Sequence, residues 1–165
     1  MDLKEMLKEG ADAALELGKD AKDFAEDLVE KAGDAFEKVI GDQPTYYDRA
    51  ADIYKMMGEG KTLDAFDKYY HDDVVIQEAT GDVREGKATS RQFQEQWLAS
   101  IEEFHGGGAR AITSNEKEKV TMVEAWVEVT FKDGNRMKME EVAVQHWNDD
   151  GLIVRERFYY NVPSA

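Results

Sequence analysis

Two Asp-Gly pairs, Asp133-Gly134 and Asp150-Gly151, constrain the fold of this 165-residue chain more than any other feature. Asp-Gly is a preferred sequence for tight hairpin turns, because both residues tolerate the positive φ angles that such turns require. Each pair separates runs that are rich in β-branched and aromatic residues, which favour strands. We therefore expect antiparallel strands over residues 109–113, 120–131, 137–147 and 152–160.

The sequence before these strands has the periodicity of helices. Thr45, with Asp48 three residues later, has the pattern of an N-cap for a helix over 46–57. Thr62 is placed to cap a shorter helix over 63–70, whose apolar residues recur on one face. The sequence thus predicts two helices in succession.

A strand and a third helix should follow. Val74-Val75-Ile76 is a β-branched run that predicts a strand. The third helix should end at Gly106-Gly107-Gly108, which has the pattern of a cap and turn, and should include Phe93, Trp97, Ile101 and Phe104. This order indicates an α+β fold, with a curved antiparallel sheet packed on three helices and a cavity between them.

The chain divides into two predicted regions, 1–43 and 44–165, because Pro44 lacks an amide donor and restricts the residue before it. Apolar residues in 1–43 recur every eleven positions, which keeps one stripe along a helix, as in Met6, Leu17, Leu28 and Val39. This pattern resembles the amphipathic repeats of apolipoprotein-like and late-embryogenesis-like helices. Six lysines against thirteen acidic residues give the region a net charge of -7, whereas membrane-surface helices carry a basic polar face. We therefore favour packing or self-association over attachment to lipid or to a partner.

Composition excludes several classes of function. The chain has 21 basic and 36 acidic residues, so its net charge of -15 should repel nucleic acids and anionic membranes. It has no cysteine, which excludes disulfides, thiol catalysis and thiolate metal sites. His71, His105 and His146 lack the short spacing of a metal site, so we expect neither a metal nor a cofactor. No apolar run has the length of a membrane span or a signal-peptide core, and we expect a cytoplasmic protein.

Three short segments carry a resemblance to a known family: Tyr70-His71-Asp72-Asp73-Val74, Glu85-Gly86-Lys87 and Asp150-Gly151-Leu152-Ile153-Val154. In this order they resemble SnoaL-like proteins of the nuclear transport factor 2-like superfamily, over roughly residues 46–161. The resemblance implies a cone-shaped sheet around one pocket, and it implies a homodimer. Ketosteroid isomerases, polyketide cyclases and non-catalytic proteins share this fold, so the fold alone does not decide the function.

The ketosteroid isomerase pattern aligns with this chain without a gap from Tyr54 to Glu78. The resemblance implies that Tyr54 donates a hydrogen bond to an oxyanion and that Glu78 moves the proton. The third position, a protonated carboxylic acid in that enzyme, is occupied by Gln145 here. An amide can donate through its NH₂ group at any pH, so Gln145 could still stabilise an enolate.

The residues themselves leave alternatives open. Strand alternation puts Glu141 on the same face as Gln145, so Glu141 or Glu124 could be the buried carboxylate in place of Glu78. Arg155-Glu156-Arg157 is expected on a strand face as cross-strand ion pairs. The apolar side chains expected around the pocket are Met57, Phe66, Trp97, Met139 and Trp147.

The sequence therefore predicts a pocket for a small, largely apolar molecule. Proton transfer next to a carbonyl, as in isomerases, cyclases and dehydratases, needs a base within reach of the proton and donors aimed at the oxygen. The alternative is a module without catalysis, which binds a ligand or forms a dimer.

Overall fold

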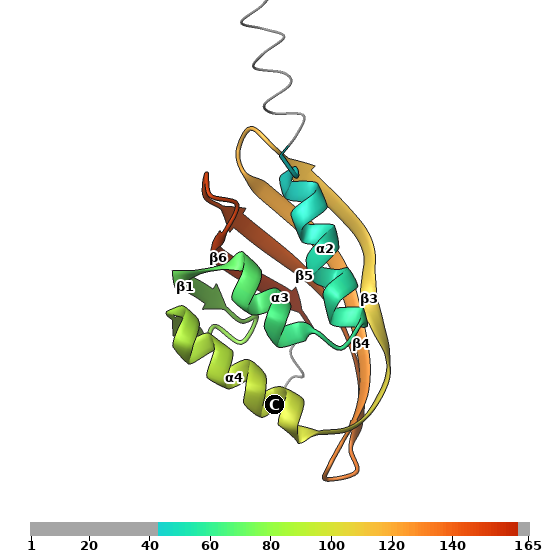
Figure 1. Ribbon diagram of the computed structural model, residues 1–165. Coiled ribbons are helices and arrows are strands. Elements are labelled where there is room, and N and C mark those ends of the chain that lie inside the picture. Colours follow the sequence, from blue (N-terminus) through green and yellow to red (C-terminus); the bar gives the residue numbers. More distant parts are fainter. Residues whose placement is uncertain (1–42, 162–165) are drawn as a thin grey trace, which may run out of the picture. The chain divides into compact units, whose positions relative to one another are not determined.

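The computed structural model describes residues 43–161, and the predicted helical segment over 1–43 lies outside these residues except for Gln43 (Figure 1). Three helices are present in the described part: α2 (Tyr46–Gly58), α3 (Thr62–Tyr69) and α4 (Lys87–Ser100). None of the helices in residues 43–161 is long and apolar enough to cross a membrane. The six strands are β1 (Tyr70–Gln77), β2 (Val83–Glu85), β3 (Ile101–Asn115), β4 (Val120–Phe131), β5 (Arg136–Trp147) and β6 (Ile153–Tyr160).

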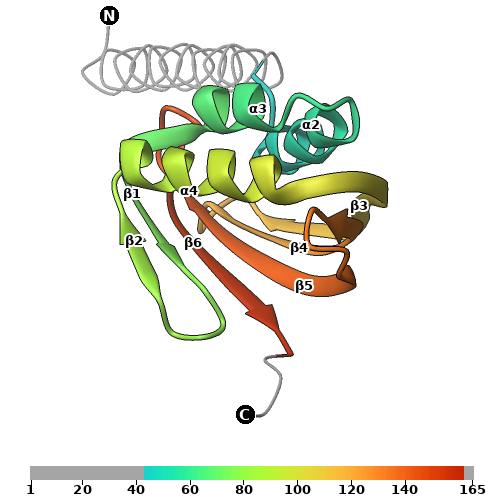
Figure 2. The ribbon, with the colours of Figure 1, turned by 90° about the horizontal axis from the view of Figure 1, so that it is seen from below.

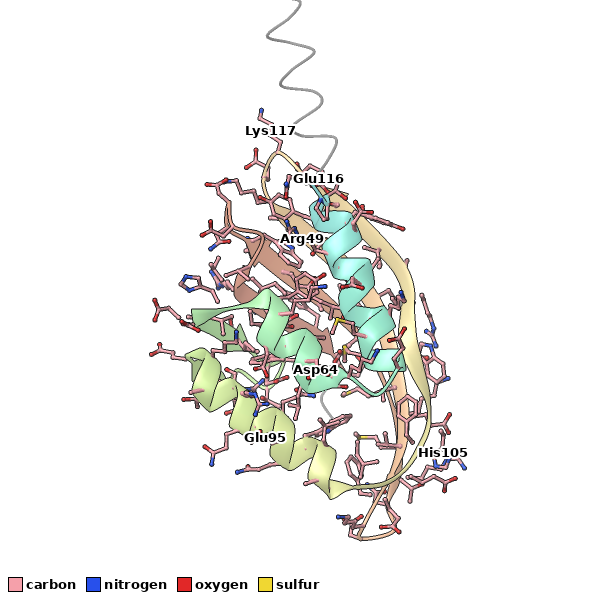
Figure 3. All side chains as sticks on the ribbon, viewed as in Figure 1. Arg49, Asp64, Glu95, His105, Glu116 and Lys117 are labelled. Atoms are coloured by element: carbon pink, nitrogen blue, oxygen red, sulfur yellow. The ribbon has the colours of Figure 1, made fainter. Side chains whose placement is uncertain are left out.

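Helix α2 begins as its sequence predicts. Thr45 and Asp48 form a capping box, in which the Thr45 hydroxyl accepts from the Asp48 amide at 3.1 Å. Glu116, on the β3–β4 connection, adds a second cap, because its carboxylate accepts from the amides of Tyr46 at 2.9 Å and Tyr47 at 3.1 Å. Glu116 and the start of α2 are adjacent in Figure 3. This cap ties the helix to a hairpin that is distant in sequence.

Helix α3 begins one residue earlier than expected. Lys61 is its N-cap, and Thr62 is already helical, so the prediction that Thr62 caps the helix is wrong. No side chain caps this end, and a tight turn at Glu59-Gly60, in which Gly60 has a φ of 77°, leads into the helix. Asp64 on α3 and Glu95 on α4 are exposed and point outward from the helices (Figure 3).

The six strands form one curved sheet in the order β2-β1-β6-β5-β4-β3. Neighbours from β3 to β6 are antiparallel, and the two Asp-Gly pairs connect β4 to β5 and β5 to β6, as predicted. Strand β1 pairs with β6 in the parallel direction, so the sheet is mixed and not wholly antiparallel. Parallel neighbours need a long connection, which here includes α4 and strands β3 to β5. The pairing places Ile76 of β1 opposite Glu156 of β6.

The third helix is shorter than its pattern predicts. It ends at Ser100, and Gly106-Gly107-Gly108 lies within strand β3 and not in a helix cap. A Cβ atom on Gly106 would lie 2.8 Å from Cη2 of Trp126, so glycine makes room for the indole ring of the neighbouring strand. Three register shifts interrupt the pairing of β3 with β4, and such bulges bend a strand. The glycines therefore allow strand β3 to bend and to pack closely against Trp126.

All three helices cover the same face of the sheet (Figure 2). The hydrophobic core lies between these layers and includes Ile53 of α2, Val74 of β1 and Ile153 of β6, each at most 2% exposed. Charged pairs such as Arg136 with Glu128 lie at the surface. The α+β class and the sheet packed on three helices are thus confirmed. Curvature leaves part of the space under the helices unfilled.

Candidate functional site

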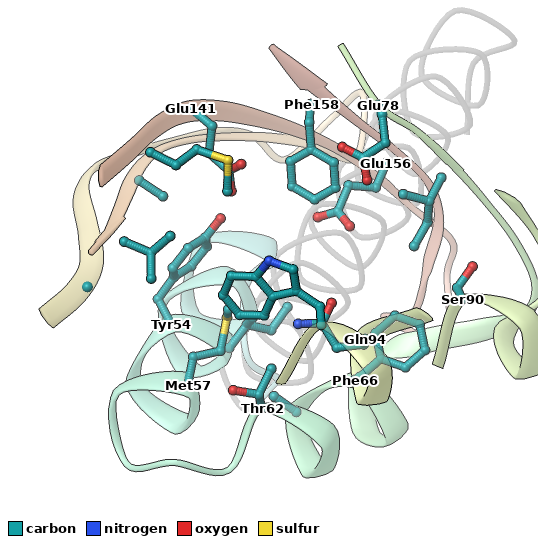
Figure 4. A pocket seen from close by; sticks show the side chains of 18 of the residues that line it. Tyr54, Met57, Thr62, Phe66, Glu78, Ser90, Gln94, Glu141, Glu156 and Phe158 are labelled. Atoms are coloured by element: carbon teal, nitrogen blue, oxygen red, sulfur yellow. The ribbon is translucent and has the colours of Figure 1, made fainter. Parts of the chain in front are cut away.

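A cavity of about 530 Å³ lies between the inner face of the curved sheet and the three helices (Figure 4). Small-molecule sites in proteins usually have volumes of roughly 300–1,000 Å³. Most of the lining side chains are apolar or aromatic. Four of the five side chains expected from the sequence are among them: Met57, Phe66, Trp97 and Met139.

Trp147 does not line the cavity, which corrects the expectation from strand alternation. Its side chain belongs to the hydrophobic core, where its ring centroid is 5.8 Å from that of Tyr46 and 6.3 Å from that of Tyr69. Its indole Nε1 donates to Thr121 Oγ1 at 2.9 Å. Alternation places Trp147 correctly on the inner face, but at this end of β5 neighbouring aromatic side chains fill the space.

Gln145 lines the cavity, but its amide is already engaged. Its Oε1 accepts from Thr121 Oγ1 at 2.8 Å, and its Nε2 donates to Glu156 Oε1 at 2.9 Å. The Thr121 bond fixes which end of the amide points toward Glu156. Gln145 is 1% exposed, so it holds a neighbouring carboxyl in place and offers at most one free N–H to a ligand.

Glu156 is the residue that sequence reasoning missed. It is 2% exposed and lines the cavity, whereas the sequence predicts it on a strand face in cross-strand ion pairs. Its Oε2 accepts from the Tyr70 hydroxyl at 2.7 Å, and its Oε1 accepts from Gln145. Alternation along β6 carried the signal, because Glu156 shares the inner face with Phe158 and Tyr160. Its neighbours Arg155 and Arg157 are exposed on the other face, and this charged sequence favoured a surface interpretation of all three residues.

Burial raises the pKa of Glu156 from 4.5 to about 7. The hydrogen bonds from Gln145 and Tyr70 act in the opposite direction, because they favour the charged carboxylate, and nearby Glu78 raises the pKa further. Burial thus brings the pKa of Glu156 close to neutral pH, where a carboxyl group can both release and accept a proton.

Glu78 also lines the cavity, on the chain just after β1, but charged and polar partners hold it. It forms an ion pair with Arg84, and its Oε2 accepts from the Tyr160 hydroxyl at 3.1 Å. The Arg84 guanidinium in turn stacks over the ring of Phe93, with its Cζ atom 3.9 Å from the ring centroid. Both carboxylate oxygens of Glu78 thus have protein partners.

Tyr54 reaches the cavity from α2, and its hydroxyl has no hydrogen-bond partner within residues 43–161. Burial raises the pKa of Tyr54 well above 10, and the charges of Glu156 and Glu141 raise it further. The phenol therefore keeps its proton and can donate it in a hydrogen bond to a ligand. Figure 4 shows Tyr54 extending toward the sheet side of the cavity.

Of the two alternative carboxylates, Glu141 lines the cavity and Glu124 does not. Glu124 is on the surface, where its side chain is 51% exposed and pairs with Arg110 at 3.5 Å. Burial raises the pKa of Glu141 from 4.5 to about 7, with further contributions from Glu156 and Glu78. In the described part of the chain, no side chain or backbone group donates a hydrogen bond to the carboxyl group of Glu141.

The cavity thus combines an apolar wall with groups suited to proton transfer. Glu156 and Glu141 have pKa values near the physiological range, where a general acid or base is most effective. Tyr54 supplies a hydrogen-bond donor that is not otherwise used. Among residues 43–161, no cluster of three His, Asp or Glu side chains has the geometry to hold a metal ion.

Comparison with known proteins identifies the family. A family model described as the SnoaL-like domain matches residues 45–160. The crystal structure of a protein from Mesorhizobium loti, assigned as a SnoaL-like polyketide cyclase, is 32% identical and has a TM-score of 0.58. That match covers 68% of this chain and 96% of the other. No curated protein is significantly similar to this chain.

More distant structures share the fold. A protein from Pseudomonas putida, assigned as a polyketide cyclase, is 18% identical with a TM-score of 0.61, over 72% of this chain and 92% of that one. SalBIII, an epoxide hydrolase/cyclase-like enzyme of pyran ring formation in salinomycin, is 21% identical with a TM-score of 0.60, over 71% and 91%. The family match over most of the chain, together with the relative at 32% identity, shows that the chain belongs to the SnoaL-like family.

Proposed function

We propose that this protein binds a small, largely apolar molecule in its cavity and transfers a proton next to a carbonyl group of that molecule. The reaction would be of the isomerase, cyclase or dehydratase type. One observation carries the proposal: Glu156, a buried carboxyl with a pKa of about 7, lines an apolar cavity and is held by Gln145 and Tyr70. A carboxyl in this state can accept and return a proton at neutral pH.

The roles of the other residues follow from their partners. Glu156 is the general base in this proposal, because its partners are neutral donors, whereas the guanidinium of Arg84 makes Glu78 a weaker base. Tyr54 donates to the oxygen on which charge develops. Gln145 is a positioning residue that acts through Glu156, and not the oxyanion donor that the resemblance implied.

The relatives are consistent with such a reaction. The Mesorhizobium loti protein is assigned as a polyketide cyclase, and SalBIII is described as epoxide hydrolase/cyclase-like. Carbonyl cyclisations begin with removal of a proton beside a carbonyl, and an enolate with charge on oxygen follows. A base with a pKa near 7 and a phenol donor in one cavity meet both requirements.

Deuterium exchange tests this proposal without knowledge of the natural substrate. With 2-tetralone, a neutral bicyclic ketone, in D₂O at neutral pD, the full chain should speed replacement of the C1 protons, which proton NMR follows directly. Tyr54→Phe should lower the exchange rate by about 100-fold, because removal of one oxyanion donor typically has an effect of this size. Tyr47→Phe is the matched control, since Tyr47 lies on the same helix and is 47% exposed.

Binding is measured separately with N-phenyl-1-naphthylamine, whose fluorescence rises in an apolar environment. Probe binding that 2-tetralone displaces, combined with exchange at the rate of the buffer alone, would contradict proton transfer and support the alternative of a ligand-binding module without catalysis. Equal exchange rates for Tyr54→Phe and the parent chain would show that Tyr54 does not donate to the oxyanion.

A further inference from the structure

The charged side chains of the cavity are strongly unbalanced. Four acidic residues line it, Glu78, Asp82, Glu141 and Glu156, whereas Arg84 is the one basic residue among the described lining side chains. The ion pair between Arg84 and Glu78 largely cancels both charges. The remaining acidic groups give the cavity a negative potential, which low-dielectric walls strengthen. A carboxylate or phosphate ligand would meet like charges, and the one basic side chain among the described lining residues, Arg84, is already paired with Glu78.

The acidic groups differ in their partners. Glu156 accepts from Gln145 and Tyr70, and Asp82 accepts from the Thr80 hydroxyl at 2.7 Å. Glu141 is the one lining acid whose carboxyl group accepts no hydrogen bond from residues 43–161. Glu141 is half-buried, so a ligand that supplies a donor to its carboxyl group would replace the remaining water and gain a charge-assisted hydrogen bond there.

The surroundings of Glu141 fit one kind of donor. Tyr54 from α2 and Glu141 from β5 face the same part of the cavity (Figure 4), and Met139, two residues before Glu141 on β5, also lines it. A hydroxyl group would satisfy one carboxylate oxygen of Glu141. A protonated amine would also neutralise its charge, and its apolar body would remain against the aromatic wall. Charge-assisted hydrogen bonds of this kind are roughly twice as strong as neutral ones.

We infer that the ligand of this cavity carries a basic amine on an apolar body, and that Glu141 binds its ammonium group. This inference rests on the proposed binding function but not on the proposed proton transfer. Glu141 then binds the ligand, whereas Glu156 remains the general base of the proposed reaction. It also predicts that anionic molecules of the same size are rejected.

Three matched compounds test the inference by displacing N-phenyl-1-naphthylamine from the full chain at pH 7.5. They are 1-naphthylmethylamine, 1-naphthylmethanol and 1-naphthoate, which differ chiefly in charge. The amine should bind about ten times more tightly than the alcohol, and the naphthoate at least ten times more weakly, since each charge-assisted contact in a poorly solvated site has about this effect.

Glu141→Gln should reduce the preference for the amine over the alcohol to about twofold, with the affinity for the alcohol retained, because the charge is removed and the shape is kept. Glu141→Asp keeps the charge and should keep the preference. Glu124→Gln is the control on the neighbouring strand and should behave as the parent chain.

The outcomes separate this inference from the function on which it rests. Equal affinity of the parent chain for amine and alcohol, or a preference that persists in Glu141→Gln, would overturn the inference and leave apolar binding intact. Failure of every compound and of the probe itself to bind would overturn the proposed binding function as well.

Discussion

Glu156→Gln is expected to lower the rate of deuterium exchange into 2-tetralone by at least 100-fold, because general base catalysis by a positioned side chain typically contributes about 10²–10⁴-fold. Glutamine has the shape of glutamate and can still form hydrogen bonds with Gln145 and Tyr70. An amide, however, cannot accept a proton near neutral pH. Proton NMR in D₂O measures the rate. Glu102→Gln, at an exposed position, should exchange at the parent rate.

Glu78→Gln separates the two candidate bases. It removes the ion pair with Arg84, so some loss of activity is expected, but the exchange rate should stay well above that of Glu156→Gln. The reverse order, with Glu156→Gln active and Glu78→Gln inactive, would contradict the assignment. Proton transfer would then belong to Glu78, as the resemblance to ketosteroid isomerase implied.

Stability should fall as pH rises through the range in which Glu156 titrates. In the unfolded chain this carboxyl has a pKa near 4.5, whereas burial raises its folded pKa to about 7. The folded state therefore binds more protons between these values, and the free energy of unfolding decreases from about pH 4.5 to pH 7 and stays low above it. A shift of this size corresponds to roughly 3 kcal/mol.

Urea unfolding at pH 5 and pH 8 measures this effect. The parent chain should lose about 2–3 kcal/mol more than Glu156→Gln between these pH values, since the two chains differ in this one titrating group. The net charge of -15 affects both chains almost equally, so the comparison removes its contribution. Parallel pH profiles for the two chains would show that Glu156 titrates normally and would contradict the account.

Much of the fold could be predicted from local sequence signals. The Asp-Gly turns, the Thr45 cap and the order of elements gave the α+β class, because turn and cap chemistry depend on neighbouring residues. The prediction of a helix cap at Gly106-Gly107-Gly108 was wrong, because the role of these glycines depends on a residue that is distant in sequence. These glycines are required by Trp126 on the neighbouring strand, and no local pattern shows which ring will approach them.

The site was predicted only in part, because its chemistry depends on long-range pairing. Tyr54 and Glu78 line the cavity as the alignment implied. Glu156 was missed because β6 lies between β1 and β5, so its inner face is covered although its sequence is highly charged. That Gln145 donates to Glu156 follows from their cross-strand pairing, which the sequence of either strand alone does not reveal. The homodimer stays a prediction.

The central claim is that Glu156 is a protonatable group near pH 7 inside the cavity. A carbon-13 NMR titration of the glutamate side-chain carboxyls tests it most directly, with the Glu156 resonance assigned by its absence in Glu156→Gln. The account predicts a midpoint near 7, because burial raises the pKa of this carboxyl from its ordinary value of 4.5. A midpoint close to 4.5 would contradict it.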